Sequence, residues 1–109
     1  MGHPLLSQKS LMRLSSLLTM EVCQRVMIDL GMSADRITIT RREANKQYMP
    51  EEFLLLLTWC QGVRGTKDDC DVIKDIEVAL QHIGRRDLAL KIAKARKEKR
   101  EFDNQDVYD

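Results

Sequence analysis

The sequence predicts an all-α protein, a six-helix antiparallel bundle, and three observations support this. Apolar side chains recur at the three- and four-residue spacing of amphipathic helices along most of the chain. Glycine is scarce, and aromatic residues make up only 5% of the chain, so Leu, Ile, Val and Met must fill the core. Each apolar stretch is also too short to be stable as an isolated helix. Mutual burial of the apolar faces is therefore what stabilises the fold.

The first half of the chain predicts three helices. Residues 1–6 are interpreted as a disordered start or an expression remnant and are left out of the fold. A first helix is expected over residues 7–18 and a second over residues 20–30, where Gly31 ends it. A short third helix follows over residues 34–42.

The third element has two interpretations. It contains Ile37-Thr38-Ile39-Thr40, and alternation of β-branched residues is also typical of a strand. A helix or turn is favoured, because no second strand is predicted for it to pair with. Residues 44–49 are expected to be a connector, with one further helical turn as the alternative.

Three more helices are expected in the second half. The helix over residues 50–61 starts with a proline followed by two glutamates, a pattern typical of helix starts. After a loop with two glycines, Asp68 or Asp69 is expected to cap a helix over residues 70–82. A last helix is expected over residues 86–99.

The length of the chain indicates one domain. The 109 residues are enough for a single core, and we expect the domain to span residues 7–100. Residues 101–109 are expected to form an acidic, flexible tail, because the apolar rhythm stops at Arg100. The formal net charge of +1, from 18 basic and 17 acidic residues, is not typical of a dedicated nucleic-acid-binding protein. No apolar stretch approaches the ~20 residues that a membrane span needs.

The cysteines indicate a reducing environment. There are three of them, with no Cys-x-x-Cys pair and no secretory signal, which argues against a disulfide framework and predicts a cytoplasmic protein. Cys23 and Cys60 fall on apolar helical faces, so we expect buried thiols rather than reactive ones.

The residue pattern predicts no catalytic, cofactor or metal site. The only histidines, His3 and His82, are far apart in the chain, and neither has further metal ligands or a nucleophile at a suitable spacing. The two pairs of adjacent carboxylates stand at predicted helix starts, where capping accounts for them. We therefore expect a protein without enzymatic activity.

Charge is segregated along the chain. Residues 33–47 contain four basic and two acidic residues, residues 67–77 five acidic and two basic, and residues 85–100 eight basic and two acidic. Solvated helix faces whose charges suit the helix dipoles are one interpretation. The other is a basic and an acidic patch on opposite parts of the bundle, which bind a second copy or a relative head to tail.

The chain resembles the death domains. Residues 76–92 are similar to the signature of the fifth and sixth death-domain helices, in which a Leu-x-x-x-Leu helix ends in a hydrophobic-Gly pair followed by Arg-Arg-Asp-Leu-Ala. Leu56-Leu57-Thr58-Trp59 looks like the fourth helix of the family, and Leu30-Gly31-Met32-Ser33 like its Leu-Gly-hydrophobic-Ser junction. The resemblance extends over residues 7–95.

Two features depart from the family pattern, and a third points to a sister family. Cys23 stands where death domains usually carry a Trp, and Ile37-Thr38-Ile39-Thr40 fits the family pattern for that helix poorly. Arg85-Arg86-Asp87-Leu88 also satisfies the Arg-x-Asp-Leu motif of the death effector domains. Trp59 and Gly84 favour the death domain, so the chain is interpreted as a divergent member of that family.

The resemblance implies the death fold, with its six helices in Greek-key order, and a non-enzymatic role in apoptotic or innate-immune signalling. The expected partners are other death-domain proteins, such as receptor tails, adaptors of the Fas-associated type or kinases, and a second copy of the chain. Neither nucleic acid nor direct membrane contact is expected. The alternative is a basic last helix that binds nucleic acid or anionic lipid, although the acidic tail that follows it would shield it.

The resemblance also implies which residues bind partners. One side of the contact is expected to include Arg36, Arg41, Arg42, Glu43 and Lys46. Complementary sides are expected to include Glu51, Glu52, Asp68, Asp69 and Asp71. A third group belongs either to a binding surface or to a structural network within the molecule, and it consists of Arg85, Arg86 and Asp87.

Overall fold

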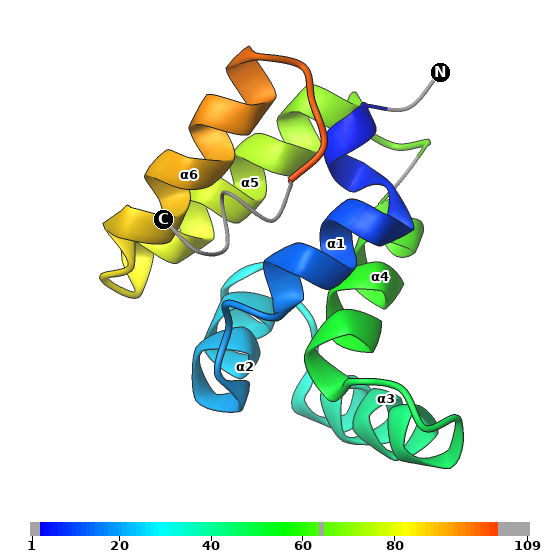
Figure 1. The fold of residues 1–109 in the computed structure, drawn as a ribbon. Helices are drawn as coiled ribbons and strands as arrows, with labels where there is room; N and C mark the ends of the chain where they lie inside the picture. The colour runs from blue at the N-terminus through cyan, green and yellow to red at the C-terminus, as the bar shows by residue number, and fades with distance from the viewer. Residues whose placement is uncertain (1–2, 64, 103–109) are drawn as a thin grey trace.

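The computed structural model describes residues 3–63 and 65–102, which contain six α-helices and no strand (Figure 1). The predicted six-helix bundle is confirmed. A short 3₁₀ helix precedes the bundle. In chain order the elements are η1 (Pro4–Leu6), α1 (Gln8–Ser15), α2 (Met20–Asp29), α3 (Ala34–Lys46), α4 (Glu51–Val63), α5 (Asp69–His82) and α6 (Arg86–Lys97).

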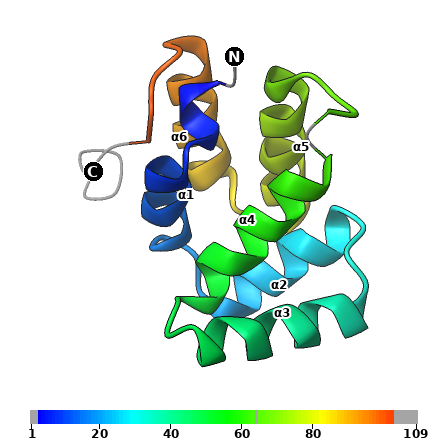
Figure 2. The same cartoon turned by 90° about the vertical axis from the view of Figure 1, so that its right-hand side faces the viewer.

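Helix α4 contacts α1, α2 and α3, while α5 packs against α6 and α2. Helix α4 lies on the right-hand side of the molecule in Figure 1 and faces the viewer in Figure 2. Its three contacts agree with its sequence, because apolar residues occupy more than one face of this helix. Its buried side chains are Phe53, Leu55, Leu56, Trp59 and Cys60. Every other α-helix contributes side chains to the same core.

Side-chain caps set the starts of the first three α-helices. The hydroxyl oxygens of Ser7, Thr19 and Ser33 accept hydrogen bonds from backbone N–H groups three residues later, at 3.1, 3.2 and 3.2 Å. The helix expected over residues 7–18 therefore ends earlier, at Ser15, and a tight turn leads into the cap of α2. Leu18, within that turn, is still buried.

The strand alternative for the third element is wrong. Ile37, Thr40 and Ala44 are buried, whereas Ile39 is 59% exposed, which is helical spacing rather than alternation. Because Ala44 continues the buried stripe, α3 extends to Lys46. The first half of the connector expected over residues 44–49 is thus the last turn of α3, which agrees with the alternative of one further helical turn.

The expectation of a disordered start is wrong for residues 3–6. Leu5 and Leu6 are only 2% and 4% exposed, because η1 folds them against the core. The backbone N–H of His3 also donates to Asp69 Oδ2 at 2.6 Å. Two adjacent leucines show no helical period, so the sequence pattern gave no sign of this packing. Residues 1–2 lie outside the described part.

The expectation of a flexible tail is wrong at its first two positions. Phe102 is fully buried, and its N–H donates to Ser10 Oγ at 2.8 Å. Arg13 Nη1 donates to the carbonyl oxygen of Phe102 at 3.1 Å and lies 3.9 Å from Glu101 Oε2. The folded domain therefore extends to Phe102. The rest of the expected tail, residues 103–109, lies outside the described residues.

Candidate functional site

The basic residues expected on one side of the contact lie on α3. Arg36 and Arg42 are exposed and form no ion pair within the described residues. Arg41 instead donates from Nε to Glu51 Oε1 at 2.8 Å, joining α3 to the start of α4. One residue expected on the basic side and one expected on the complementary side thus meet within a single molecule.

The remaining residues near this pair have local partners. Lys46 Nζ lies 3.9 Å from Glu43 Oε1 within α3. The backbone carbonyl oxygen of Glu52 accepts the Cys23 thiol, with Sγ 3.8 Å away. Burial, and then the negative charge of Glu52, raise the pKa of the Cys23 thiol to about 12. The exposed cations of α3 are therefore Arg36, Arg42 and Lys46, of which only the two arginines are unpaired within the described residues.

The acidic group lies at the start of α5. Asp68 occupies the N-cap position but makes no side-chain capping bond, and it is exposed, as is Asp71. Asp69 is half-buried and accepts the His3 N–H. This group and α3 lie at opposite ends of the bundle in both views (Figures 1 and 2).

The basic last helix, by contrast, runs beside the acidic one. Because α5 and α6 are antiparallel neighbours, Arg96 of α6 donates from Nε to Glu77 Oε2 of α5 at 2.7 Å. At the other end of α6, Arg85 donates two hydrogen bonds of 3.2 Å to Asp87 and holds the pKa of that carboxyl below its ordinary value. Arg86 between them is exposed. Arg85 and Asp87 thus form a local structural pair, whereas Arg86 lies at the surface.

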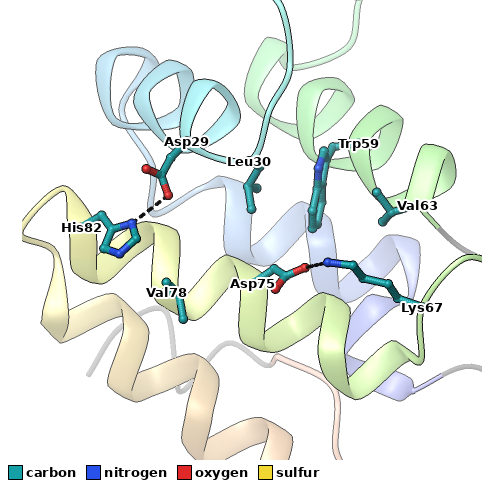
Figure 3. Close-up of a pocket in the computed structure, with 8 residues that line it drawn as sticks. All are labelled: Asp29, Leu30, Trp59, Val63, Lys67, Asp75, Val78 and His82. Atoms are coloured by element: carbon teal, nitrogen blue, oxygen red, sulfur yellow. Dashed lines mark hydrogen bonds and ion pairs between the residues drawn. The ribbon is translucent and has the colours of Figure 1, made fainter.

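A pocket of about 350 Å³ opens between the end of α2, the end of α4 and α5 (Figure 3). A hydrogen bond and an ion pair frame it: His82 Nδ1 lies 3.0 Å from Asp29 Oδ2, and Lys67 Nζ lies 2.6 Å from Asp75 Oδ2. We call it the Trp59 pocket, and it is lined by Asp29, Leu30, Trp59, Val63, Lys67, Asp75, Val78 and His82.

A second hollow, of about 340 Å³, adjoins the Trp59 pocket and shares Leu30, Trp59 and Val63 with it. Arg36 lines this second hollow, so the basic surface of α3 continues into it. Neither hollow is predicted from the sequence. The residues of the Trp59 pocket alone come from four separate segments, and no spacing within one segment marks them as neighbours.

No protein-family model, curated protein or solved structure matches this chain. Within residues 3–63 and 65–102, no helix has the length and apolar character to cross a membrane. The same residues include no cluster of three His, Cys, Asp or Glu side chains that could hold a metal ion. The described residues do contain an exposed arginine, Arg36, beside a partly apolar hollow, an arrangement suited to contact with another protein.

Proposed function

We propose that this chain is a non-enzymatic interaction module that binds death-domain proteins through the exposed arginines of α3, as an adaptor in apoptotic or innate-immune signalling. The observation that carries the proposal is the corner between α5 and α6, where the resemblance is most specific. Gly84 ends α5 with a φ of 84°, a conformation that favours glycine. Leu88 and Ala89 of the resembling stretch then pack in the core.

The surface of α3 supports a charged contact. Arg36 and Arg42 present guanidinium groups that can bind a carboxylate with two hydrogen bonds each. Such contacts set the register and speed of association more than its strength. The expected partner surface is therefore acidic, as is the start of α5 at the other end of this molecule.

The test is a charge reversal at α3. Arg42→Glu is expected to abolish capture of death-domain proteins from a cell lysate, with captured proteins identified by mass spectrometry. Helical content and melting temperature should stay unchanged, because Arg42 is exposed and unpaired within the described residues. Arg41→Glu is less suitable, since it would place a second carboxylate beside Glu51.

Lys94→Glu on α6 is the matched control, because Lys94 is also exposed and the charge change is the same. Unchanged capture by the Arg42 variant would refute the proposed surface. Recovery of death effector domain proteins in place of death-domain proteins would assign the chain to the sister family.

One observation favours a second candidate, binding of an anionic surface by α6. Arg86, Leu90 and Lys94 follow one another at four-residue spacing and are all exposed, with Leu90 at 64%. An exposed leucine within a basic stripe is typical of helices that bind anionic lipid. Here Lys94→Glu, rather than Arg42→Glu, would reduce retention on heparin or on vesicles containing phosphatidylserine.

A further inference from the structure

We propose that Tyr48 of one molecule inserts into the Trp59 pocket of a second copy of this chain, so that molecules join head to tail. The inference deepens the proposed function and rests on it in one respect, since it names the chain itself as a homotypic partner. The contact is made by Tyr48 and the Trp59 pocket and does not include Arg42, while Arg36 lines the hollow that adjoins the pocket.

The backbone conformation and the exposure of Tyr48 favour a contact with another molecule. It follows the last turn of α3 with a φ of 56°, and its side chain is 97% exposed. The N–H of Met49 donates to the carbonyl oxygen of Ala44 at 2.9 Å, which is the helix-ending bond of a Schellman motif. Glycine is the favoured residue at such a position, because a side chain is strained there.

The strain at Tyr48 has no compensation inside the molecule. The ring buries almost none of its surface, so the fold gains no packing energy from it. An exposed tyrosine is also among the residue types that contribute most to protein interfaces. A contact between molecules would bury the ring and offset the strain.

The Trp59 pocket matches the chemistry of a tyrosine side chain. Leu30, Trp59 and Val78 provide apolar contacts for the ring, and the pocket's volume of about 350 Å³ accommodates one aromatic group. Asp75 and His82 at the rim can hydrogen-bond a phenol hydroxyl. A buried tyrosine needs such a partner at its polar end.

The charges near the two surfaces are already paired within each molecule and add little to the contact. Lys46, two residues before Tyr48, has its partner within α3. The pocket rim carries two carboxylates, Asp29 and Asp75, each beside a basic partner. Because a carboxylate accepts more than one hydrogen bond, Lys46 of a second molecule can still approach one of them.

Tyr48 cannot reach the pocket of its own molecule. It stands just before α4, a helix of 13 residues and therefore about 20 Å long, while Trp59 and Val63 lie near the far end of that helix. In Figure 2 the turn between α3 and α4 is at the lower left, whereas the ends of α2 and α4 and the whole of α5 lie to the right. The contact must therefore join different surfaces of two molecules, which builds open chains unless the rotation closes a ring.

The first experiment measures assembly by sedimentation velocity from micromolar concentrations up to about 1 mM. This range is needed because a contact made mainly by one side chain buries little surface and is expected to have a low affinity. The wild type is expected to exceed the dimer mass as its concentration rises. Tyr48→Gly is expected to remain monomeric while its thermal midpoint rises by about 4 °C, since the backbone strain is relieved.

Lys99→Gly is the matched control. Lys99 ends α6 with a φ of 54°, so glycine should raise the thermal midpoint in the same way and leave assembly intact. A wild type that stays monomeric up to about 1 mM would overturn the inference, as would a Tyr48→Gly variant that assembles like the wild type.

The second experiment tests the pocket and the head-to-tail mode. Val78 is 45% exposed in the pocket, so Val78→Lys should block it without unfolding the protein, and Leu90→Lys on α6 is the control. Each of Tyr48→Gly and Val78→Lys retains one intact surface. Mixed in equal amounts they should form dimers and nothing larger, and failure to do so would overturn the inference.

Different variants test the proposed function and this inference. Arg42→Glu is expected to lose death-domain partners and to keep self-association, while Tyr48→Gly should do the reverse. Loss of self-association in the Arg42 variant would show that the two surfaces are one, and would overturn the inference as stated.

Discussion

At the scale of single residues, the three cysteines differ in what surrounds their thiols. Cys23 and Cys60 are 0% and 2% exposed, which confirms that both are buried, while Cys70 lies at the surface. Burial raises the pKa of Cys23 to about 12, so its thiol is protonated as well as covered at neutral pH.

We therefore expect a thiol-specific reagent at pH 8 to modify one cysteine of the native protein rapidly. That residue is Cys70, and the two buried thiols should react only at the rate of unfolding. Reaction progress followed by mass spectrometry checks this. Cys70→Ser should remove the fast phase, and a fast phase that survives the substitution would contradict the prediction.

Also at the residue scale, the ion pair between Glu77 and Arg96 is more shielded from water than the others. Their side chains are 10% and 19% exposed, and the guanidinium donates two hydrogen bonds to the carboxylate. Because Glu77 holds the pKa of Arg96 above its ordinary value, Arg96 remains charged even though it is largely covered.

Glu77→Gln is expected to lower the free energy of unfolding by about 2 kcal/mol, because a largely covered cation loses its charged hydrogen-bond partner. Urea unfolding followed by circular dichroism measures the change. Glu21→Gln is the control, since its pair with Arg25 is 63–76% exposed and should contribute less than about 0.5 kcal/mol. Equal losses in both variants would contradict the role of burial.

At the scale of elements, the segment after α6, which ends at Phe102, packs in the core and forms hydrogen bonds with α1. Phe102 fills part of the core, and hydrogen bonds to Ser10 and Arg13 of α1 hold its backbone. A single aromatic residue therefore couples the two ends of the folded chain.

Phe102→Ala is expected to lower the free energy of unfolding by about 3–5 kcal/mol, through lost burial and a cavity. Ser10→Ala, which removes only the hydroxyl that accepts the Phe102 N–H, should cost about 1 kcal/mol. Urea unfolding of both variants checks the ranking. If the segment were a flexible tail, as the sequence pattern predicts, Phe102→Ala would have no effect.

At the scale of the whole molecule, the two proposed surfaces differ in the forces they use. The α3 surface consists of exposed charges, whereas the Tyr48 contact buries an aromatic ring in a pocket with apolar walls. Salt screens exposed charges over distances of about 8 Å at physiological ionic strength and affects apolar burial much less.

Raising the salt concentration should therefore weaken partner capture through α3 several-fold and leave self-association through Tyr48 nearly unchanged. Sedimentation velocity and partner binding, each measured at low and high salt, check this. Self-association that disappears at high salt would mean that Lys46 and the pocket carboxylates, rather than the ring, supply most of the contact.

The six helices and most of their buried faces can be predicted from the sequence alone. Helical periodicity is a property of one segment, so the inward positions of α5 and α6, such as Ile76 and Ile92, can be read from spacing alone. The same holds for helix ends marked by a local residue, such as Gly84. The resemblance to death domains rests on residues of this kind.

Which distant residues meet follows from the packing of the helices and not from the sequence pattern. The fold pairs Arg41 with Glu51, which the resemblance to death domains assigns to different sides of a contact, and it places Phe102 against α1. It also assembles the Trp59 pocket from four separate segments. The physical reason is that side-chain spacing records the direction of an apolar face within one helix, whereas these contacts depend on how all the helices pack.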